Sequence, residues 1–61
     1  MAFKDIILPT VEEMLALIRR KPGINMRQMH DLNYRLVFGK LDYLLGEELI
    51  FKDNDRYYPN D

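Results

Sequence analysis

The apolar side chains in the first third of the chain recur at the spacing of an α-helix. They fall on one stripe of a helical wheel, which consists of Met14, Leu15, Leu17 and Ile18. Thr10 and Glu13 have the spacing of a capping box, in which each side chain accepts a hydrogen bond from the backbone amide of the other. Pro22 and Gly23 then interrupt the pattern. The sequence therefore predicts a first helix over residues 11–20.

A second, shorter helix is predicted over residues 26–31. Asn25 precedes it and Gln28 lies three positions later, which is the amide counterpart of the same capping box. Met29 is expected to face the core from this helix. Ile24 lies just before the helix, and we expect it to form either a one-residue strand or a buried plug.

The third helix is predicted over residues 34–45, with Asn33 as its N-cap and Gly46 at its end. One side of its wheel is apolar, with Phe38 at the edge of a group formed by Val37, Leu41, Leu44 and Leu45. The opposite side is mixed and carries Arg35, Gly39 and Asp42, flanked by Leu36, Lys40 and Tyr43. We therefore expect the core to be centred on Leu15, Ile18, Leu41 and Leu44.

Two strands are predicted at residues 49–52 and 56–59, where apolar and aromatic residues flank a turn-forming segment. A two-residue loop would set Asp53 opposite Arg56, whereas a three-residue loop would set Lys52 opposite Arg56. Directly opposed like charges are unfavourable in a sheet, so we favour the two-residue loop.

Length and composition limit what the chain can be. The 61 residues allow one domain, expected over 1–61 with its core in 10–59. The absence of cysteine excludes a disulfide framework and a thiolate zinc site. The apolar runs are too short to cross a bilayer and the first residues do not resemble a signal peptide, so we expect a cytoplasmic protein. A formal net charge of −1 speaks against binding of nucleic acid by bulk charge alone.

This order of elements, three helices and then a hairpin, resembles a winged helix-turn-helix domain. The residues that carry the likeness are those leading into the wing of small bacterial and archaeal regulators, matched here by Leu41, Leu44, Leu49 and Ile50, with Tyr57 or Tyr58 as the aromatic that closes the hairpin. The sequence departs from the pattern at Glu48, where a glycine is usual, and we expect Gly46 to serve the turn instead. Over residues 10–59 the resemblance implies a mainly α fold with a C-terminal β-hairpin as the wing.

The resemblance also implies a small regulator of transcription. Its third helix would enter the major groove of double-stranded DNA, and its wing, residues 49–58, would lie on the backbone. The candidate DNA contacts are Arg27, Tyr34, Arg35, Gly39, Lys40, Tyr43, Lys52 and Arg56. Among them, Arg35 could bind guanine in a bidentate manner, while Lys52 and Arg56 could bind phosphate. Because so few cations bind weakly in a monomer, we expect a homodimer or a protein partner.

A second interpretation is a winged-helix module that binds protein and not DNA. It rests on exposed apolar and aromatic side chains, namely Leu36, Phe38 and Tyr43 with Phe3 and the two wing tyrosines. Aromatic residues are enriched at the centres of protein interfaces. The same side chains could also complete the core of so small a domain, so both interpretations stay open.

Catalysis and metal binding lack the residue types they need. The chain has no serine or cysteine to act as a nucleophile and no glycine-rich phosphate loop, and Glu12 and Glu13 serve the helix cap. His30 is the only histidine, and with Asp31 it offers too few ligands for a metal ion. We therefore expect no enzyme activity, no cofactor, no metal and no small-molecule substrate.

Overall fold

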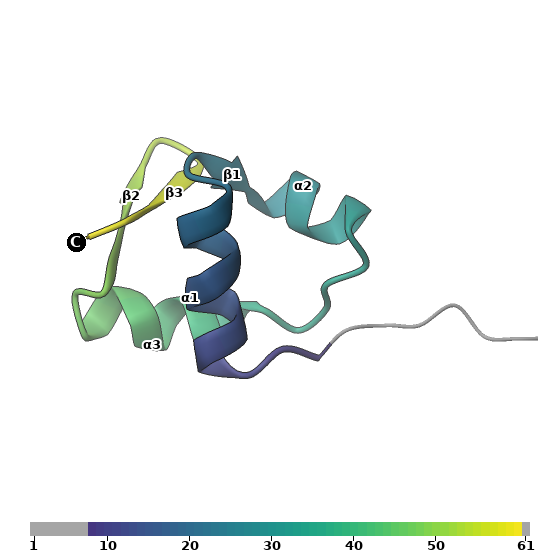
Figure 1. Ribbon diagram of the computed structural model, residues 1–61, viewed down its shortest axis with the longest axis horizontal. Helices are drawn as coiled ribbons and strands as arrows, with labels where there is room; N and C mark the ends of the chain where they lie inside the picture. The colour runs from purple at the N-terminus through teal and green to yellow at the C-terminus, as the bar shows by residue number, and fades with distance from the viewer. Residues whose placement is uncertain (1–7, 61) are drawn as a thin grey trace, which may run out of the picture.

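The computed structural model describes residues 8–60, so the expectation for Phe3 lies outside the described residues. Within that range three helices and one three-stranded antiparallel sheet form an α+β arrangement (Figure 1). The elements are α1 (Val11–Arg20), β1 (Ile24–Asn25), α2 (Met26–Asp31), α3 (Phe38–Gly46), β2 (Ile50–Asp53) and β3 (Arg56–Pro59). Helix α1 packs against both α3 and β3, and so joins the helical part to the sheet.

Both predicted capping boxes are present, and they explain why α1 and α2 begin where they do. The Thr10 hydroxyl accepts from the Glu13 amide at 3.1 Å, and Glu13 Oε1 accepts from the Thr10 amide at 2.9 Å. At α2, Asn25 Oδ1 accepts from the Gln28 amide at 2.8 Å, and Gln28 Oε1 accepts from the Asn25 amide at 3.0 Å. The predicted bounds of both helices are confirmed.

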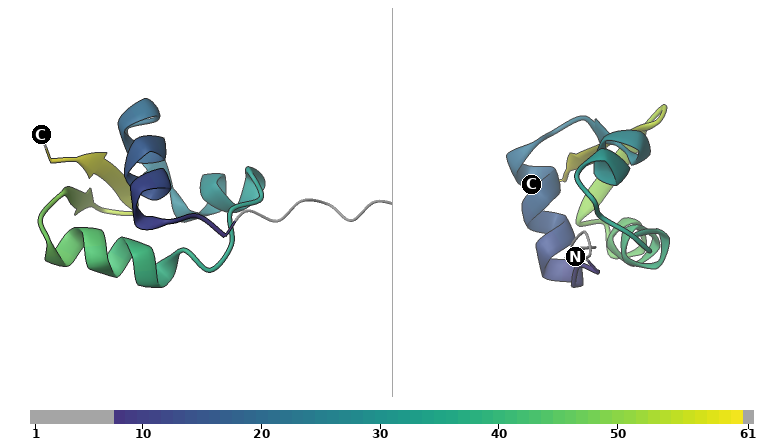
Figure 2. Two further views of the ribbon diagram at one scale, coloured as in Figure 1. Left: turned by 60° about the horizontal axis from the view of Figure 1, so that its bottom comes forward. Right: turned by 90° about the vertical axis from the view of Figure 1, so that its right-hand side faces the viewer.

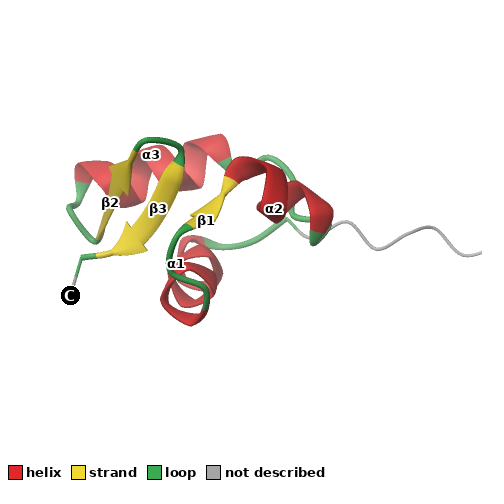
Figure 3. Ribbon diagram, turned by 90° about the horizontal axis from the view of Figure 1, so that it is seen from above, coloured by secondary structure: helices red, strands yellow, loops and turns green. Residues whose placement is uncertain are grey.

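The sheet has β3 at its centre, between β1 and β2 (Figure 3). Asp53 lies opposite Arg56 in the β2–β3 pair, so the two-residue loop is confirmed, although β2 begins at Ile50 and not at residue 49. Ile24 pairs with Tyr57 in β3 and is 3% exposed. The predicted hairpin is therefore part of a larger sheet, to which the segment before α2 adds a third strand.

Asn33 does not cap the third helix as predicted, because it ends the second one. It has a φ of +67°. Its amide donates to the His30 carbonyl at 2.9 Å, and the Tyr34 amide donates to the Met29 carbonyl at 3.0 Å. These two hydrogen bonds form a Schellman motif, in which the residue after the cap adopts the left-handed conformation. Asparagine is the usual alternative to glycine at that position.

Helix α3 consequently begins at Phe38 and not at residue 34. Leu36 also has a positive φ, of +54°, so the chain cannot enter a helix before Val37. Val37 occupies the N-cap position without a side-chain hydrogen bond. Residues 32–37 therefore form a loop that is longer than the turn of about three or four residues typical of a helix-turn-helix motif.

The end of α3 is a second Schellman motif, and its left-handed residue is Glu48. The Glu48 amide donates to the Leu45 carbonyl at 3.1 Å, and the Leu49 amide donates to the Leu44 carbonyl at 3.0 Å. Glu48 has a φ of +61°, whereas Gly46 is the last helical residue and has no positive φ. The expectation that Gly46 would serve the turn is therefore wrong, because the turn needs its left-handed residue two positions later.

We expect Glu48→Gly to raise the free energy of unfolding by about 0.5–1 kcal/mol, because glycine adopts the left-handed conformation without the clash that a Cβ causes. The hydrogen bond from Asn60 Nδ2 to the Glu48 carbonyl, at 2.8 Å, involves only the backbone of residue 48 and should survive. Urea denaturation followed by circular dichroism measures the change. A lower denaturation midpoint would mean that the glutamate side chain stabilises the fold.

The core lies where α1, α3 and the sheet meet. Its buried residues are Met14, Leu17, Ile18, Ile24, Met29, Val37, Leu41, Leu44, Ile50 and Tyr57. Three of the four predicted core centres, Ile18, Leu41 and Leu44, are confirmed. Leu15 is only half-buried, because the buried side of α1 runs through Met14, Leu17 and Ile18 and leaves position 15 at its edge.

Candidate nucleic-acid interface

Helix α3 lies along one side of the molecule, and the other elements approach it from one direction only (Figure 2). Its uncovered side carries Phe38, Gly39, Asp42 and Tyr43, of which Phe38 is 69% and Tyr43 53% exposed. Lys40 is half-buried. The side of the helix that could meet a partner is thus more apolar than basic, and any positive charge must come from neighbouring segments.

Positive charge comes from two of those segments at a hollow of about 450 Å³, which we call the wing hollow. It is lined by Asn25, Met26, Arg27, Phe38, Lys52, Asp55 and Tyr57. Arg27 belongs to α2 and Lys52 to β2, and both are exposed. The fold therefore brings two predicted contacts, far apart in sequence, to one hollow that Phe38 also lines.

A smaller hollow of about 250 Å³, the loop hollow, is also lined by Phe38. Its lining is mostly apolar and comprises Met26, Met29, His30, Tyr34, Arg35, Leu36, Val37 and Phe38. Met26 and Phe38 line both hollows, so the two adjoin. Arg35 thus lies in the hollow next to the one lined by Arg27 and Lys52, and we refer to these three side chains as the cationic rim.

Tyr34 and Arg56 are placed less favourably for DNA contact. Tyr34 is half-buried and packs against the core from the loop before α3. The Arg56 guanidinium donates from Nη1 to the Gly23 carbonyl at 2.9 Å, so part of its hydrogen-bonding capacity serves the fold. Both were predicted as contacts, but neither belongs to the cationic rim, although Arg56 is exposed.

Side-chain contacts across the sheet hold the hairpin in place. The rings of Phe51 and Tyr58 stack with centroids 5.2 Å apart, and Lys52 Nζ lies 5.8 Å from the centroid of the Tyr57 ring. Because Tyr57 is buried in the core, Lys52 is anchored over a fixed surface at the edge of the wing hollow. Its position relative to α3 is therefore set by the fold.

Neither Leu36 nor Phe38 is among the predicted DNA contacts, although both belong to the exposed apolar set of the protein-binding interpretation. Leu36 is 74% exposed, more than any other large hydrophobic residue of the described chain. On the helical wheel Phe38 lies at the edge of the apolar side, where the pattern alone does not decide burial. Leu36 owes its position to a left-handed backbone that no local signal indicates, since leucine rarely adopts it.

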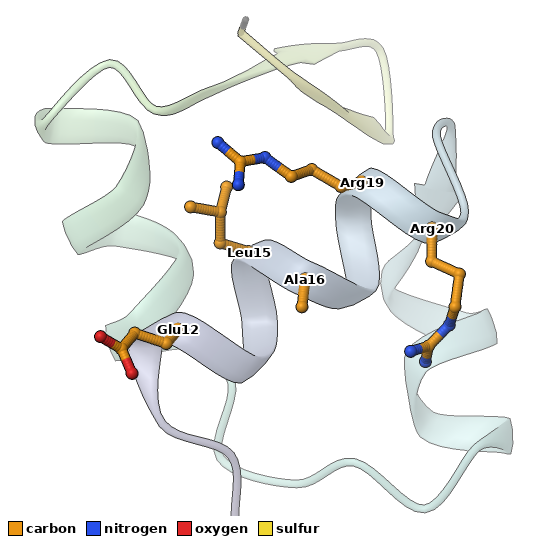
Figure 4. Close-up of a pocket in the computed structure, with 5 residues that line it drawn as sticks. All are labelled: Glu12, Leu15, Ala16, Arg19 and Arg20. Atoms are coloured by element: carbon orange, nitrogen blue, oxygen red, sulfur yellow. The ribbon is translucent and has the colours of Figure 1, made fainter.

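A separate hollow of about 500 Å³ runs along α1 and is lined by Glu12, Leu15, Ala16, Arg19 and Arg20 (Figure 4). All five residues come from one helix. In the close-up Arg19 and Arg20 extend in different directions, and the Glu12 carboxylate lies at the other end of the helix. These polar groups do not converge on one point, as they would around a small ligand.

Within residues 8–60, no group of three or more His, Cys, Asp or Glu side chains is placed to hold a metal ion. None of the helices in this part of the chain is long and apolar enough to cross a membrane. Comparisons with protein-family models, with curated proteins and with solved structures gave no match for this chain.

Proposed function

We propose that this chain is a non-catalytic DNA-binding domain of the winged helix-turn-helix type that regulates transcription. The observation that carries the proposal is the cationic rim. Arg27, Arg35 and Lys52 come from α2, the following loop and β2, yet all three line one or the other of two adjoining hollows that share Phe38, on the first turn of α3. The residues that line the two hollows include a single acid, Asp55. Such a local excess of cations matches a polyanion even though the whole chain carries a net charge of −1.

In the proposed complex the first turn of α3 enters the major groove, which is wide enough for one helix. Arg35, beside this turn, binds a base edge, and Arg27 and Lys52 bind phosphates on either side of the groove. Lys40 and Tyr43 supply further backbone contacts from α3. Asp42 opposes binding, because its exposed carboxylate is repelled by phosphates.

Three or four phosphate contacts make binding weak, since they correspond to a slope of about −3 to −4 in log K against log salt. We therefore propose that the domain acts as a homodimer or together with a protein partner. A second copy doubles the number of contacts on one duplex, as it does for dimeric regulators that bind paired half-sites.

A second candidate function is binding of a protein through the same surface. The exposure of Leu36, Phe38 and Tyr43 favours it, because large apolar side chains that lie together on a surface often mark protein interfaces. The cationic rim favours DNA, because three cations with a single acid among the lining residues match a row of phosphates. The two candidates differ in their response to salt, so one titration separates them.

The test is a salt titration of binding to mixed-sequence duplex DNA, starting at about 50 mM salt. Affinity should fall steeply as salt rises. Arg27→Ala and Lys52→Ala should each reduce the slope of log K against log salt by about one unit. Arg35→Ala should relax the preference for particular base sequences. Arg20→Ala is the matched control, because Arg20 lies on α1 and lines neither hollow of the proposed surface. Absence of binding at about 50 mM salt would overturn the proposal in favour of a protein partner.

Gly39 gives an independent prediction in which stability and binding move in opposite directions. A Cβ at this position would meet no atom within 4 Å, and alanine favours a helix over glycine by about 0.5–1 kcal/mol. We expect Gly39→Ala to raise the thermal midpoint while weakening DNA binding, because the added methyl group keeps the α3 backbone away from the base edges. An unchanged DNA affinity would show that this side of α3 does not approach the duplex.

A further inference from the structure

We propose that Leu36 and Phe38 read bases alongside Arg35 and that they recognise the C5-methyl groups of thymine. This inference rests on the proposed DNA-binding function and adds to it a class of target, thymine-containing sites read through the major groove. It starts from the two most exposed large apolar side chains between α2 and the end of α3.

Leu36 and Phe38 are held in place from within the fold. Val37, between them, is 4% exposed and belongs to the core. With Val37 anchored inward, the side chains on either side of it are displayed at the surface, and both line the loop hollow. The pair is therefore a fixed apolar projection at the leading end of α3.

Leu36 contributes little to the stability of the fold that displays it. Its backbone is left-handed, with a φ of +54°, which is unfavourable for a residue with a Cβ. Its side chain is mostly in water, so no burial offsets that strain. A strained residue whose side chain points into solvent suggests a use outside the fold.

The charges around this projection indicate what it meets. Arg27 and Lys52 line the wing hollow, Arg35 lines the adjoining loop hollow, and Phe38 lines both. An apolar partner surface would leave these cations without counter-charges, whereas DNA provides phosphates on both sides of the groove. An apolar tip within a cationic rim thus fits a groove whose walls are anionic and whose floor carries apolar groups.

Thymine supplies those groups. In the major groove its C5-methyl is the distinctive apolar feature among the base edges, and phenylalanine is one of the side chains that contact it. Burial of one methyl group corresponds to about a fourfold gain in affinity. The side chains of leucine and phenylalanine cannot form hydrogen bonds with base edges. Apolar contact with the thymine methyl group is therefore the way in which they can distinguish one base from another.

The experiment compares an alternating A·T duplex of about 20 base pairs, or two turns of the helix, with the same duplex in which uracil replaces thymine. The two duplexes carry the same phosphates and the same O4 acceptors and differ in the C5-methyl groups. We expect the wild-type domain to bind the thymine duplex at least about fourfold more tightly at about 50 mM salt. Phe38→Ala and Leu36→Ala should each lower the affinity for the thymine duplex and reduce the difference between the duplexes.

Leu32→Ala is the matched control. Leu32 is also exposed, at 41%, but it lines a different hollow, with Lys21, Ile24, Gln28 and Asp31. This variant should retain the full preference for thymine. Circular dichroism of each variant verifies the fold, and loss of preference in a folded Phe38→Ala variant supports the proposal.

Equal binding of the two duplexes by the wild type would overturn this inference and leave the proposed function intact. A preference that survives in both Phe38→Ala and Leu36→Ala would overturn it as well, because the methyl contact would then lie elsewhere. If neither duplex binds, the proposed function fails together with the inference. In that case a dimer seen by sedimentation without DNA, and lost in Phe38→Ala, would identify a second copy as the occupant.

Discussion

Leu41→Ala is expected to lower the free energy of unfolding by about 2–5 kcal/mol, the range for truncation of a fully buried leucine. Leu41 is 1% exposed and belongs to the core where α3 packs against α1. The substitution removes apolar contacts and leaves a cavity that the surrounding helices can fill only in part. A domain of 61 residues has little stability in reserve, so much of the population should be unfolded at 37 °C. Thermal and urea denaturation followed by circular dichroism measure the loss.

Leu36→Ala removes the same atoms at a position that is 74% exposed, and it is the control for this prediction. Because little burial is lost, its effect on stability should stay within about 0.5 kcal/mol. The difference between the stability losses of the two variants therefore measures the effect of burying the leucine side chain. Equal losses in the two variants would contradict the placement of α3, since they would imply that both leucines are packed alike.

Elements governed by neighbouring residues could be predicted from the sequence. The starts of α1 and α2 follow from hydrogen bonds between residues three positions apart, which a sequence pattern displays directly. The β2–β3 loop follows from the charges at Lys52, Asp53 and Arg56, because only one register avoids opposed cations. In each case the deciding interaction is short in sequence, so no tertiary information is needed.

The start of α3 could not be predicted in the same way. An asparagine between two helices can cap the one that follows or end the one that precedes, and both uses suit its short polar side chain. The choice for Asn33 depends on whether residue 34 turns back toward Met29. The left-handed conformation of Leu36 is unfavourable in isolation, and it stands directly before Val37, which is buried in the core, so it depends on tertiary packing that no local pattern displays.

The candidate interface was predictable as a set of residues but not as an arrangement. Arg27, Arg35 and Lys52 stand out as basic residues on predicted helix and wing segments, yet only the fold shows that they line two adjoining hollows that share Phe38. Arg56 is also a basic residue on a predicted wing strand, but its guanidinium donates a hydrogen bond within the fold. Its partner, the Gly23 carbonyl, lies 33 positions away, and no local pattern reveals so distant a hydrogen bond.

Gly23→Val is expected to lower the free energy of unfolding by about 2 kcal/mol, because a β-branched residue is forced into a left-handed backbone. Gly23 has a φ of +85°, and its added Cβ would lie 3.4 Å from Tyr58 Cε1. The residue also ties the start of β1 to β3. Its amide donates to the Tyr57 carbonyl at 2.7 Å, and its carbonyl accepts from Arg56 Nη1. Relief of the strain would therefore require breaking contacts that hold the third strand in the sheet.

Gly23→Ala should lower the free energy of unfolding by a smaller amount, about 1–2 kcal/mol, because alanine has the same unfavourable left-handed backbone but no second branch at Cβ. Gly46→Ala is the control, since Gly46 has no positive φ and a Cβ there would meet nothing within 4 Å. That substitution should stabilise α3 slightly through the higher helix propensity of alanine. If all three variants changed stability alike, the backbone conformation of Gly23 would not be the cause. If Gly23→Val left stability unchanged, the hydrogen bonds of Gly23 with Tyr57 and Arg56 would not be what holds β1 in the sheet.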